Sequence, residues 1–290
     1  MEKITILGGS GFLGSALSDY LSETNKFKIK IFDIKKKKKL KKNQIFILGN
    51  TLNIKKLEKA IKGSKYVFNF AALADLDISR DKPLETANVN IIGTINSLIV
   101  SKKYSVKKFI QASSIYANSE QGGFYGASKK ASEDYIERFN KKYGLKYSIL
   151  RFGSLYGEDA GKNNGINSII DNYIRKKFLM YNGKKTAARR YIHVEDACRA
   201  CMQSINMKYD NKYLIITGQK KIKITKVMMY LSNLLNSNKK VKYKNLEIEG
   251  HYSNEPKPFK PRKGIKLFIK NNKNLKDELN KIIKERYKKS

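Results

Sequence analysis

The 290-residue sequence predicts an α/β fold in which a doubly wound parallel sheet is followed by a smaller, mixed α/β C-terminal lobe. Two observations predict the sheet. Short β-branched runs alternate with helical segments through the first two thirds of the chain, which is typical of βαβ units. These runs are apolar at consecutive positions, as strands covered by helices on both faces must be. After Gly157 the alternation ends in a Gly- and Asn-rich stretch, where we expect the chain to leave the sheet.

The expected elements define two domains. Strands are expected at 3–7, 28–33, 44–48, 65–70, 107–113 and 146–152, and helices at 12–23, 54–61, 84–104 and 125–142. Residues 1–163 are assigned to the first domain, to which the chain returns at about 189–206. Residues 164–290 are assigned to the smaller lobe, which contains a helix near 166–177 and ends in a basic helix.

The chain is strongly basic, with 61 Lys and Arg against 25 Asp and Glu and a formal net charge of +36. Such a surface can attract anionic substrates, nucleic acid or membranes. The lysines are spread along the whole chain, however, which indicates a compositional bias. The densest cluster, residues 35–42, is interpreted as a solvated loop, with a phosphate or polyanion contact as the alternative. No recognised nucleic-acid-binding module is found, so no specific nucleic acid is expected as a partner.

Targeting and metal-binding signals are weak. There is no basic and apolar leader at Met1 and no apolar run long enough to span a membrane, so we expect a soluble cytoplasmic protein with no membrane partner. Cys198 and Cys201 form a CxxC motif in the middle of an expected helix. A redox motif would lie at a helix start, and no second pair completes a four-ligand site. We interpret both as core residues and expect no metal.

A glycine-rich turn follows the first strand. In GGSGFLG, Gly8 permits a positive φ, Gly11 lets the backbone approach a pyrophosphate, and Gly14 allows close packing of helix on strand. Phe12 and Leu13 open the helix, whose N-terminus would face the anion. This arrangement predicts a dinucleotide-binding turn.

Asp33 strengthens that prediction. It ends the second strand about 20 residues further on, where a carboxylate accepts hydrogen bonds from the adenosine ribose hydroxyls. The sheet is therefore predicted to be of the Rossmann type. A carboxylate repels a 2′-phosphate, so NAD is the expected cofactor in preference to NADP, although lysines follow closely.

Tyr125 and Lys129 lie four residues apart on an expected helix, just after a strand that ends with Ser113 and Ser114. Residues at this spacing share a helix face, so the ammonium can favour ionisation of the phenol. To act as a base near neutral pH, the phenol pKa must fall by up to ~3 units from about 10. The pattern predicts a catalytic tyrosine.

Together these segments resemble the extended short-chain dehydrogenase/reductase family, in its branch of sugar-nucleotide epimerases and dehydratases, which includes UDP-galactose 4-epimerase. The resemblance covers nearly the whole chain. It runs through GGSGFLGSAL, NFAA, NIIGTINSL, ASSIYA, YGASK, RFGSLYG and RRYIHVEDA.

The resemblance implies catalytic roles for Ser113, Tyr125 and Lys129. Tyr125 would be the acid/base, and Lys129 would lower its pKa and bind the nicotinamide ribose. Ser113 would hydrogen-bond the reacting sugar hydroxyl. The substrate diphosphate would contact Ser154, where the family usually has Asn, and Arg189, a bidentate donor.

Further cofactor contacts are implied at Asn50, Ala71, Ala72 and Asn90, beside the glycine turn, Asp33, Tyr125 and Lys129. Asn50 replaces an Asp that contacts adenine in the family, and its amide oxygen could accept the same bond. Ser114 and Ile115 stand where the 4,6-dehydratases place an Asp-Glu pair, so the proton relay for water elimination is missing.

The leading hypothesis is an NAD-dependent sugar-nucleotide epimerase. The alternatives are a reductase that consumes NAD(P)H and a cofactor-binding scaffold without turnover. The resemblance also implies a homodimer formed through the helices near 84–104 and 125–142. His193 is interpreted as a structural residue, whereas a substrate contact and a plain surface loop are equally open for His251.

Overall fold

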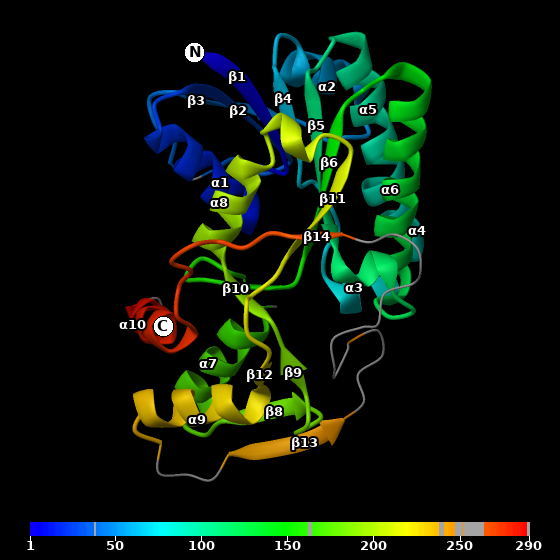
Figure 1. Cartoon of the computed structure of the whole chain (residues 1–290). Coiled ribbons are helices and arrows are strands. Elements are labelled where there is room, and N and C mark those ends of the chain that lie inside the picture. Colours follow the sequence, from blue (N-terminus) through cyan, green and yellow to red (C-terminus); the bar gives the residue numbers. More distant parts are fainter. Residues whose placement is uncertain (38, 162–163, 238–240, 247–250, 252–263, 289–290) are drawn as a thin grey trace.

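The structure is a computed structural model that describes residues 1–37, 39–161, 164–237, 241–246, 251 and 264–288. An eight-stranded sheet with helices on both faces forms the larger part of the molecule, and a smaller lobe lies against one end of it (Figure 1). The predicted class, a Rossmann-type α/β fold, is confirmed.

All the strand pairs of the large sheet are parallel, and their order is β14-β11-β6-β5-β4-β1-β2-β3. The strands are β1 (Glu2–Leu7), β2 (Phe27–Asp33), β3 (Gln44–Leu48), β4 (Tyr66–Asn69), β5 (Lys108–Ser114), β6 (Tyr147–Phe152), β11 (Lys212–Ile216) and β14 (Ile265–Lys266). The order reverses at β1, which pairs with β2 on one side and β4 on the other. Ligands of open parallel sheets bind at such a switch point, outside the carboxyl ends of the strands.

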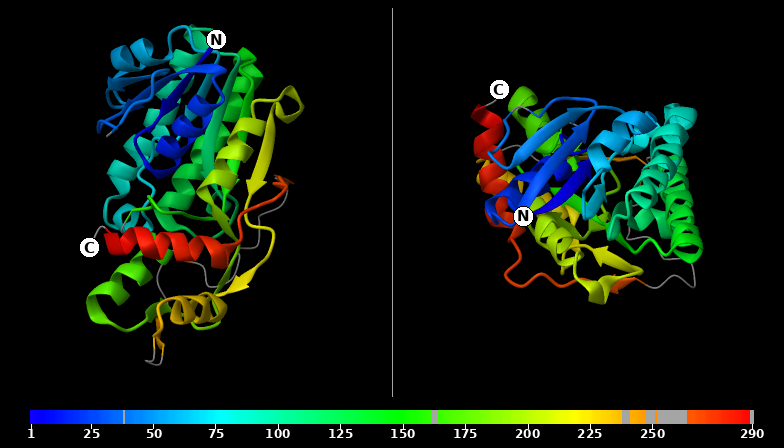
Figure 2. Two further views of the ribbon diagram at one scale, coloured as in Figure 1. Left: turned by 90° about the vertical axis from the view of Figure 1, so that its left-hand side faces the viewer. Right: turned by 90° about the horizontal axis from the view of Figure 1, so that it is seen from above.

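Helices cover both faces of this sheet, as the view from above in Figure 2 shows. The helices are α1 (Phe12–Glu23) and α8 (Val194–Gln203) on one face, and α2 (Ile54–Ile61), α5 (Gly93–Lys103) and α6 (Gly123–Tyr143) on the other. Strand side chains are buried on both sides: Ile6 lies in the α1 and α8 core and Leu7 in the core under α2, α5 and α6. Cys198 and Cys201 belong to the first of these cores, which confirms their interpretation as core residues.

The helix expected near 84–104 is interrupted. It consists of α4 (Pro83–Ala87), a π-helical turn η1 (Asn88–Ile92) and α5. A short helix that was not predicted, α3 (Leu76–Asp81), precedes it. Lys82 between α3 and α4 has a non-helical conformation, and Pro83 occupies the first turn of α4, where its missing N–H costs nothing.

The smaller lobe has its own apolar core. Its elements are α7 (Gly165–Lys176), β8 (Met180–Gly183), α9 (Ile224–Leu234), β13 (Lys242–Leu246) and α10 (Leu275–Lys288). Two small strand pairs join it to the sheet: β7 (Ser154–Tyr156) with β10 (Tyr191–His193), and β9 (Ala188–Arg189) with β12 (Ile222–Lys223). Helix α10 runs across the molecule at the level where the two parts meet (Figure 2).

The chain crosses between the two parts more often than the expected ranges imply. Residues 194–203 return as α8, in the range predicted, but β11 and β14 then extend the large sheet beyond β6. Both strands come from the part of the sequence assigned to the smaller lobe. A two-residue strand such as β14 carries no periodicity that a sequence pattern can reveal.

Within the described ranges, none of the helices combines the length and the apolar character needed to cross a membrane.

Gly14 is expected to be required for this packing. A Cβ at Gly14 would lie 2.2 Å from the carbonyl oxygen of Gly8 and 2.8 Å from Cα of Gly9, so α1 would have to move away from β1. We expect Gly14→Ala to lower the free energy of unfolding by about 1–3 kcal/mol in urea denaturation. Gly165→Ala, in the first turn of α7 with open space around its Cβ, should leave stability unchanged or slightly higher. Equal stabilities of the two variants would contradict the packing argument.

Candidate active site

The glycine turn lies between β1 and α1 and is held close to β4. Gly8 has a φ of +74°, and a Cβ there would come within 2.5 Å of the backbone nitrogen of Ala71, so only glycine fits. Its N–H donates to the carbonyl of Phe32 at 2.8 Å. Gly11 is the N-cap of α1, and it has no side chain that could cap the helix. The first N–H groups of the helix, which include those of Phe12 and Leu13, are therefore available to a ligand.

A cavity of about 310 Å³ opens at this turn, outside the carboxyl ends of β1, β2 and β4. Six of the predicted cofactor residues line it: Gly8, Gly11, Asp33, Asn50, Ala71 and Ala72. The carboxylate of Asp33 is fixed by two backbone donors, the N–H of Ser10 at 2.9 Å and the N–H of Lys35 at 3.0 Å. Phe12, Leu13 and Gly14 lie just behind, in the first turn of α1.

Asn90, also a predicted cofactor contact, is not among the residues that line this cavity. Its side chain is buried outside that cavity and brackets the backbone of Leu73, accepting from the N–H at 2.8 Å and donating to the carbonyl at 3.1 Å. It also donates to the hydroxyl of Ser128 on α6 at 2.9 Å. Asn90 therefore ties the segment after Ala72 to α6, and in the structure it supports the cofactor cavity instead of lining it.

Tyr125 and Lys129 share a face at the start of α6, as predicted. Lys129 is buried, and its Nζ lies 5.7 Å from the centroid of the Tyr125 ring. The ammonium donates to the carbonyl of Ala112 on β5 at 3.1 Å. Gly122, the N-cap of α6, has a φ of +94°, and a Cβ there would lie 2.6 Å from Cβ of Tyr116, so glycine allows the helix to start this close to η2 (Ile115–Asn118).

The two serines at the end of β5 have different partners. Successive strand side chains point to opposite sides, so the two hydroxyls reach different partners. Ser113 is buried and donates to Glu133 Oε1 at 2.7 Å, away from the phenol. Ser114 forms the hydrogen bond with the Tyr125 side chain. The structure thus places the hydroxyl of Ser114, and not that of Ser113, at the phenol, whereas a contact of Ser113 with the reacting group stays a prediction.

Burial dominates the electrostatics of this pair. It raises the pKa of Tyr125 to about 12, although the hydrogen bond from Ser114 lowers it. It lowers the pKa of Lys129 to about 8, and the negative charge of Glu133 opposes that shift. The expected depression of the phenol pKa is thus not produced by the chain alone, because desolvation outweighs the hydrogen bond from Ser114. A further positive charge beside the ring would lower the pKa of the phenol.

A second cavity, of about 370 Å³, lies where the sheet and the smaller lobe meet. Two of the three predicted substrate residues, Ser154 and Arg189, line it, and so do Tyr116 and His251, whereas Ser113 does not. The ring of Tyr116 contacts the ring of Tyr125, with centroids 6.4 Å apart, so the cavity adjoins the tyrosine. His251 is thereby placed at the cavity instead of in a plain surface loop, and burial lowers its pKa.

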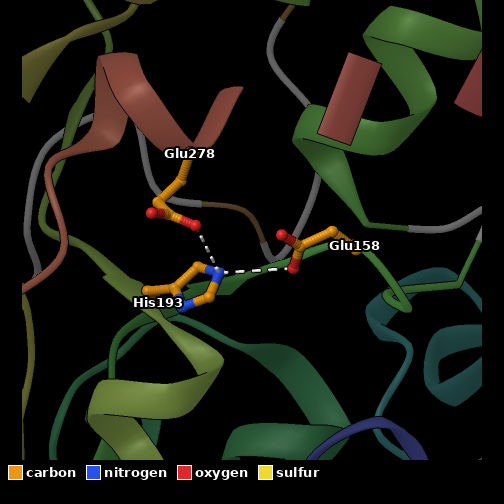
Figure 3. A group of neighbouring side chains, drawn as sticks. All are labelled: Glu158, His193 and Glu278. Carbon is orange, nitrogen blue, oxygen red and sulfur yellow. Dashed lines mark ion pairs between the residues drawn. The ribbon is translucent and has the colours of Figure 1, made fainter. Parts of the chain in front are cut away.

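His193 lies in a buried group with Glu158 and Glu278, which Figure 3 shows pointing toward one another. Its Nε2 is 3.5 Å from Glu158 and 3.6 Å from Glu278 on α10. Its Nδ1 accepts the N–H of Glu195 at 3.4 Å and so caps α8. In a neutral imidazole the proton is then on Nε2, which faces the two carboxylates. The contacts agree with the structural role expected for His193.

The lysine-rich loop is only partly the solvated loop that was expected. Lys37 is buried, and its ammonium donates to Asp19 at 2.6 Å and to Ser18 at 2.7 Å on α1. Lys41 pairs with Glu23 at the end of the same helix at 2.6 Å. Lys35 lines the cavity at the glycine turn. Part of the cluster therefore fastens the loop to α1, because acidic side chains of that helix lie within its reach.

Comparisons with known proteins agree with this arrangement. The sequence model of the NAD dependent epimerase/dehydratase family matches residues 4–215. The chain is similar to a UDP-glucose 4-epimerase of Mycoplasma genitalium, with 28% identity over 236 residues that span 68% of this chain and 69% of that one. It is also similar to a dTDP-D-glucose 4,6-dehydratase of Dictyostelium discoideum, with 29% identity over 240 residues, although it spans only 54% of that protein's length. The crystal structure of UDP-glucose 4-epimerase from Thermotoga maritima, with UDP-glucose, has a TM-score of 0.82 and 27% identity and covers 99% of both chains.

Proposed function

The chain belongs to the NAD dependent epimerase/dehydratase family, and we propose that within it the protein is a sugar-nucleotide 4-epimerase, of the kind that acts on UDP-glucose. The observation that carries the proposal is the assembly of Tyr125, Ser114 and Lys129 beside a cavity that suits a sugar nucleotide. The relatives named as UDP-glucose 4-epimerases support it.

The residues at the glycine turn fit NAD. The space that Gly8 and Gly11 leave open, the uncapped N-terminus of α1 and the fixed carboxylate of Asp33 match a pyrophosphate and a ribose. When bound, NAD supplies a hydride acceptor that also returns the hydride, so that no net oxidation occurs. Its positive ring would also provide the charge that the buried phenol of Tyr125 lacks in the chain alone.

The chain's own groups would move the proton. The phenolate of Tyr125 would take the proton from the sugar hydroxyl, becoming the phenol, and would later return it, and Ser114 would orient that hydroxyl from its place beside the Tyr125 oxygen. Lys129 would stabilise the phenolate and hold the nicotinamide ribose. Its ammonium is fixed for this purpose by the carbonyl of Ala112.

The larger cavity fits the sugar nucleotide. Among the described residues that line it, the charged side chains are Lys184 and Arg189, and both are cationic. A diphosphate would find attractive charge there, and Arg189 can bind it with two parallel hydrogen bonds. No carboxylate is found among these lining residues, so the cavity lacks an acid for eliminating water. This favours epimerisation over dehydration.

We propose a homodimer formed through α4–α5 and α6, on the basis of exposed apolar side chains there. They are Leu84, Ile92, Ile99, Phe124, Tyr135 and Tyr143. Exposed apolar patches mark association surfaces. In sedimentation velocity at micromolar concentration we expect a dimer, which Ile99→Lys should dissociate, whereas Met229→Lys, on the exposed side of α9, should not. A monomeric wild type would contradict the proposal.

The cofactor preference is testable by titration. Asp33 would meet a 2′-phosphate as a like charge, so NAD should bind at least ~10-fold more tightly than NADP by calorimetry at moderate salt. Asp33→Asn removes that charge and should reduce the difference in affinity between NAD and NADP. A preference of the wild type for NADP would mean that the nearby Lys35 outweighs the carboxylate.

The function itself is tested with UDP-, GDP-, dTDP- and CDP-sugars, whose products are resolved by NMR. We expect a 4-epimer of at least one of them.

Tyr125→Phe should keep the fold and the affinity for NAD but lower turnover by about 10²–10⁴-fold, because only the path of the proton is lost. Tyr287→Phe, on the exposed side of α10 and outside the proposed dimer surface, should be neutral. A Tyr125→Phe variant with near-normal turnover would contradict the proposed role of Tyr125 in proton transfer. Net consumption of NAD(P)H would favour a reductase, and an inert wild type would favour a scaffold.

A further inference from the structure

The face of α6 that carries Tyr125 and Lys129 continues with two carboxylates at the same four-residue spacing, Glu133 and Glu137. Each of the four side chains has a partner on the adjoining strands. Ser114 hydrogen-bonds Tyr125, the carbonyl of Ala112 accepts from Lys129, Ser113 donates to Glu133, and Tyr213 on β11 donates to Glu137 at 2.6 Å. Three consecutive residues of β5 therefore hold three successive turns of α6.

Glu133 is at the centre of a buried charge network. It is fully buried, and Arg151 on β6 is 2% exposed. The guanidinium makes two hydrogen bonds to the carboxylate, Nε to Oε1 at 2.9 Å and Nη2 to Oε2 at 2.7 Å, and Ser113 adds a third at 2.7 Å. The guanidinium also lies 4.3 Å from the centroid of the Tyr213 ring. The carboxylate is thus held in one position by three hydrogen bonds.

A network of this kind is poorly explained by stability alone. Desolvating two charges offsets most of their attraction, and apolar side chains of similar volume are often as good at such positions. The network lies one helical turn from Lys129, whose ammonium is itself buried. Glu133 opposes the effect of burial on the pKa of Lys129, which would otherwise fall further below its value of about 8.

Other charges do not replace Glu133 at this place. In the described part of the chain the titratable or charged groups of the network and its neighbours are Tyr116, Tyr125, Glu133, Glu137, Arg151 and Tyr213, and the one whose charge shifts the pKa of Lys129 is Glu133. The turn η1 presents Asn90, which is uncharged and contacts Ser128. The charged side chains of α3 and α4 are exposed and pair at the surface, as Arg80 does with Asp77 and Lys82 with Glu85.

We propose that Glu133 is a positioning residue of the active site: the buried carboxylate, locked by Arg151 and Ser113, keeps Lys129 in its ammonium form beside Tyr125. The consequence for turnover rests on the proposed function, but the effect on Lys129 does not. Ser113, which the sequence analysis placed at the substrate, then acts through Glu133. Ser114 then acts at the phenol of Tyr125, and Ser113 acts at the carboxylate of Glu133.

The test compares Glu133→Gln with Glu137→Gln, the same change one turn further along the same face. The state of Lys129 is read on the full chain, without cofactor or substrate, by competitive acetylation with acetic anhydride and peptide mass spectrometry on either side of pH 8. Removing the negative charge favours the neutral amine, so the labelling midpoint of Lys129 should fall by about one pH unit or more in Glu133→Gln. The labelling midpoint of Lys129 should stay at the wild-type value in Glu137→Gln. In Glu133→Asp the midpoint should return toward the wild-type value.

An unchanged midpoint in Glu133→Gln would overturn the proposal. If that variant does not fold, because Arg151 is left buried and unpaired, the double variant Glu133→Gln/Arg151→Met removes both charges and carries the same expectation for Lys129. In the active enzyme the alkaline limb of kcat should move to lower pH in Glu133→Gln, with KM for the sugar nucleotide little changed. A shifted midpoint in a protein inert on every sugar nucleotide would support this inference while the proposed epimerase activity fails.

Discussion

The seam between α6 and the ends of β5 and β6 is the constraint on which the rest of the site depends. It brings a phenol, an ammonium and a carboxylate onto one helix face and gives each a partner on the sheet. Glycine at position 122 lets the helix begin against η2. Because every member is buried or nearly so, a small displacement of α6 would leave polar groups without partners. The geometry of the site is therefore coupled to the packing of the sheet.

Burial sets the chemistry of this seam as much as proximity does. It raises the pKa of Tyr125 and lowers that of Lys129, so burial shifts both groups toward their uncharged forms. Opposing groups partly correct this: Ser114 at the phenol and Glu133 at the lysine. A low-dielectric site of this kind makes any added positive charge effective. The protonation of Tyr125 and Lys129 therefore depends on the charge of what binds in the two cavities beside them.

The two parts of the molecule are joined through shared elements and not through a simple linker. Strands β11 and β14 come from the C-terminal half of the chain and complete the sheet. His193 caps α8 and faces Glu278 on α10, so the last helix is tied to the covering layer of the sheet. The larger cavity lies at this junction, with Ser154 and Arg189 among its walls. Its shape thus depends on how the smaller lobe is seated.

Local signals in the sequence were sufficient for the class of fold, the glycine turn with Asp33, and the shared face of Tyr125 and Lys129, because each depends on backbone geometry over a few residues. The tertiary structure decided what depends on neighbours distant in the chain. It placed the hydroxyl of Ser114 at the phenol and that of Ser113 at Glu133, gave the side chain of Asn90 partners outside the cofactor cavity, and raised the Tyr125 pKa that the spacing alone predicted to fall. Strand orientation at its last residue, side-chain partners and desolvation arise only when β5, β6 and α6 pack together, and no spacing along the chain encodes them.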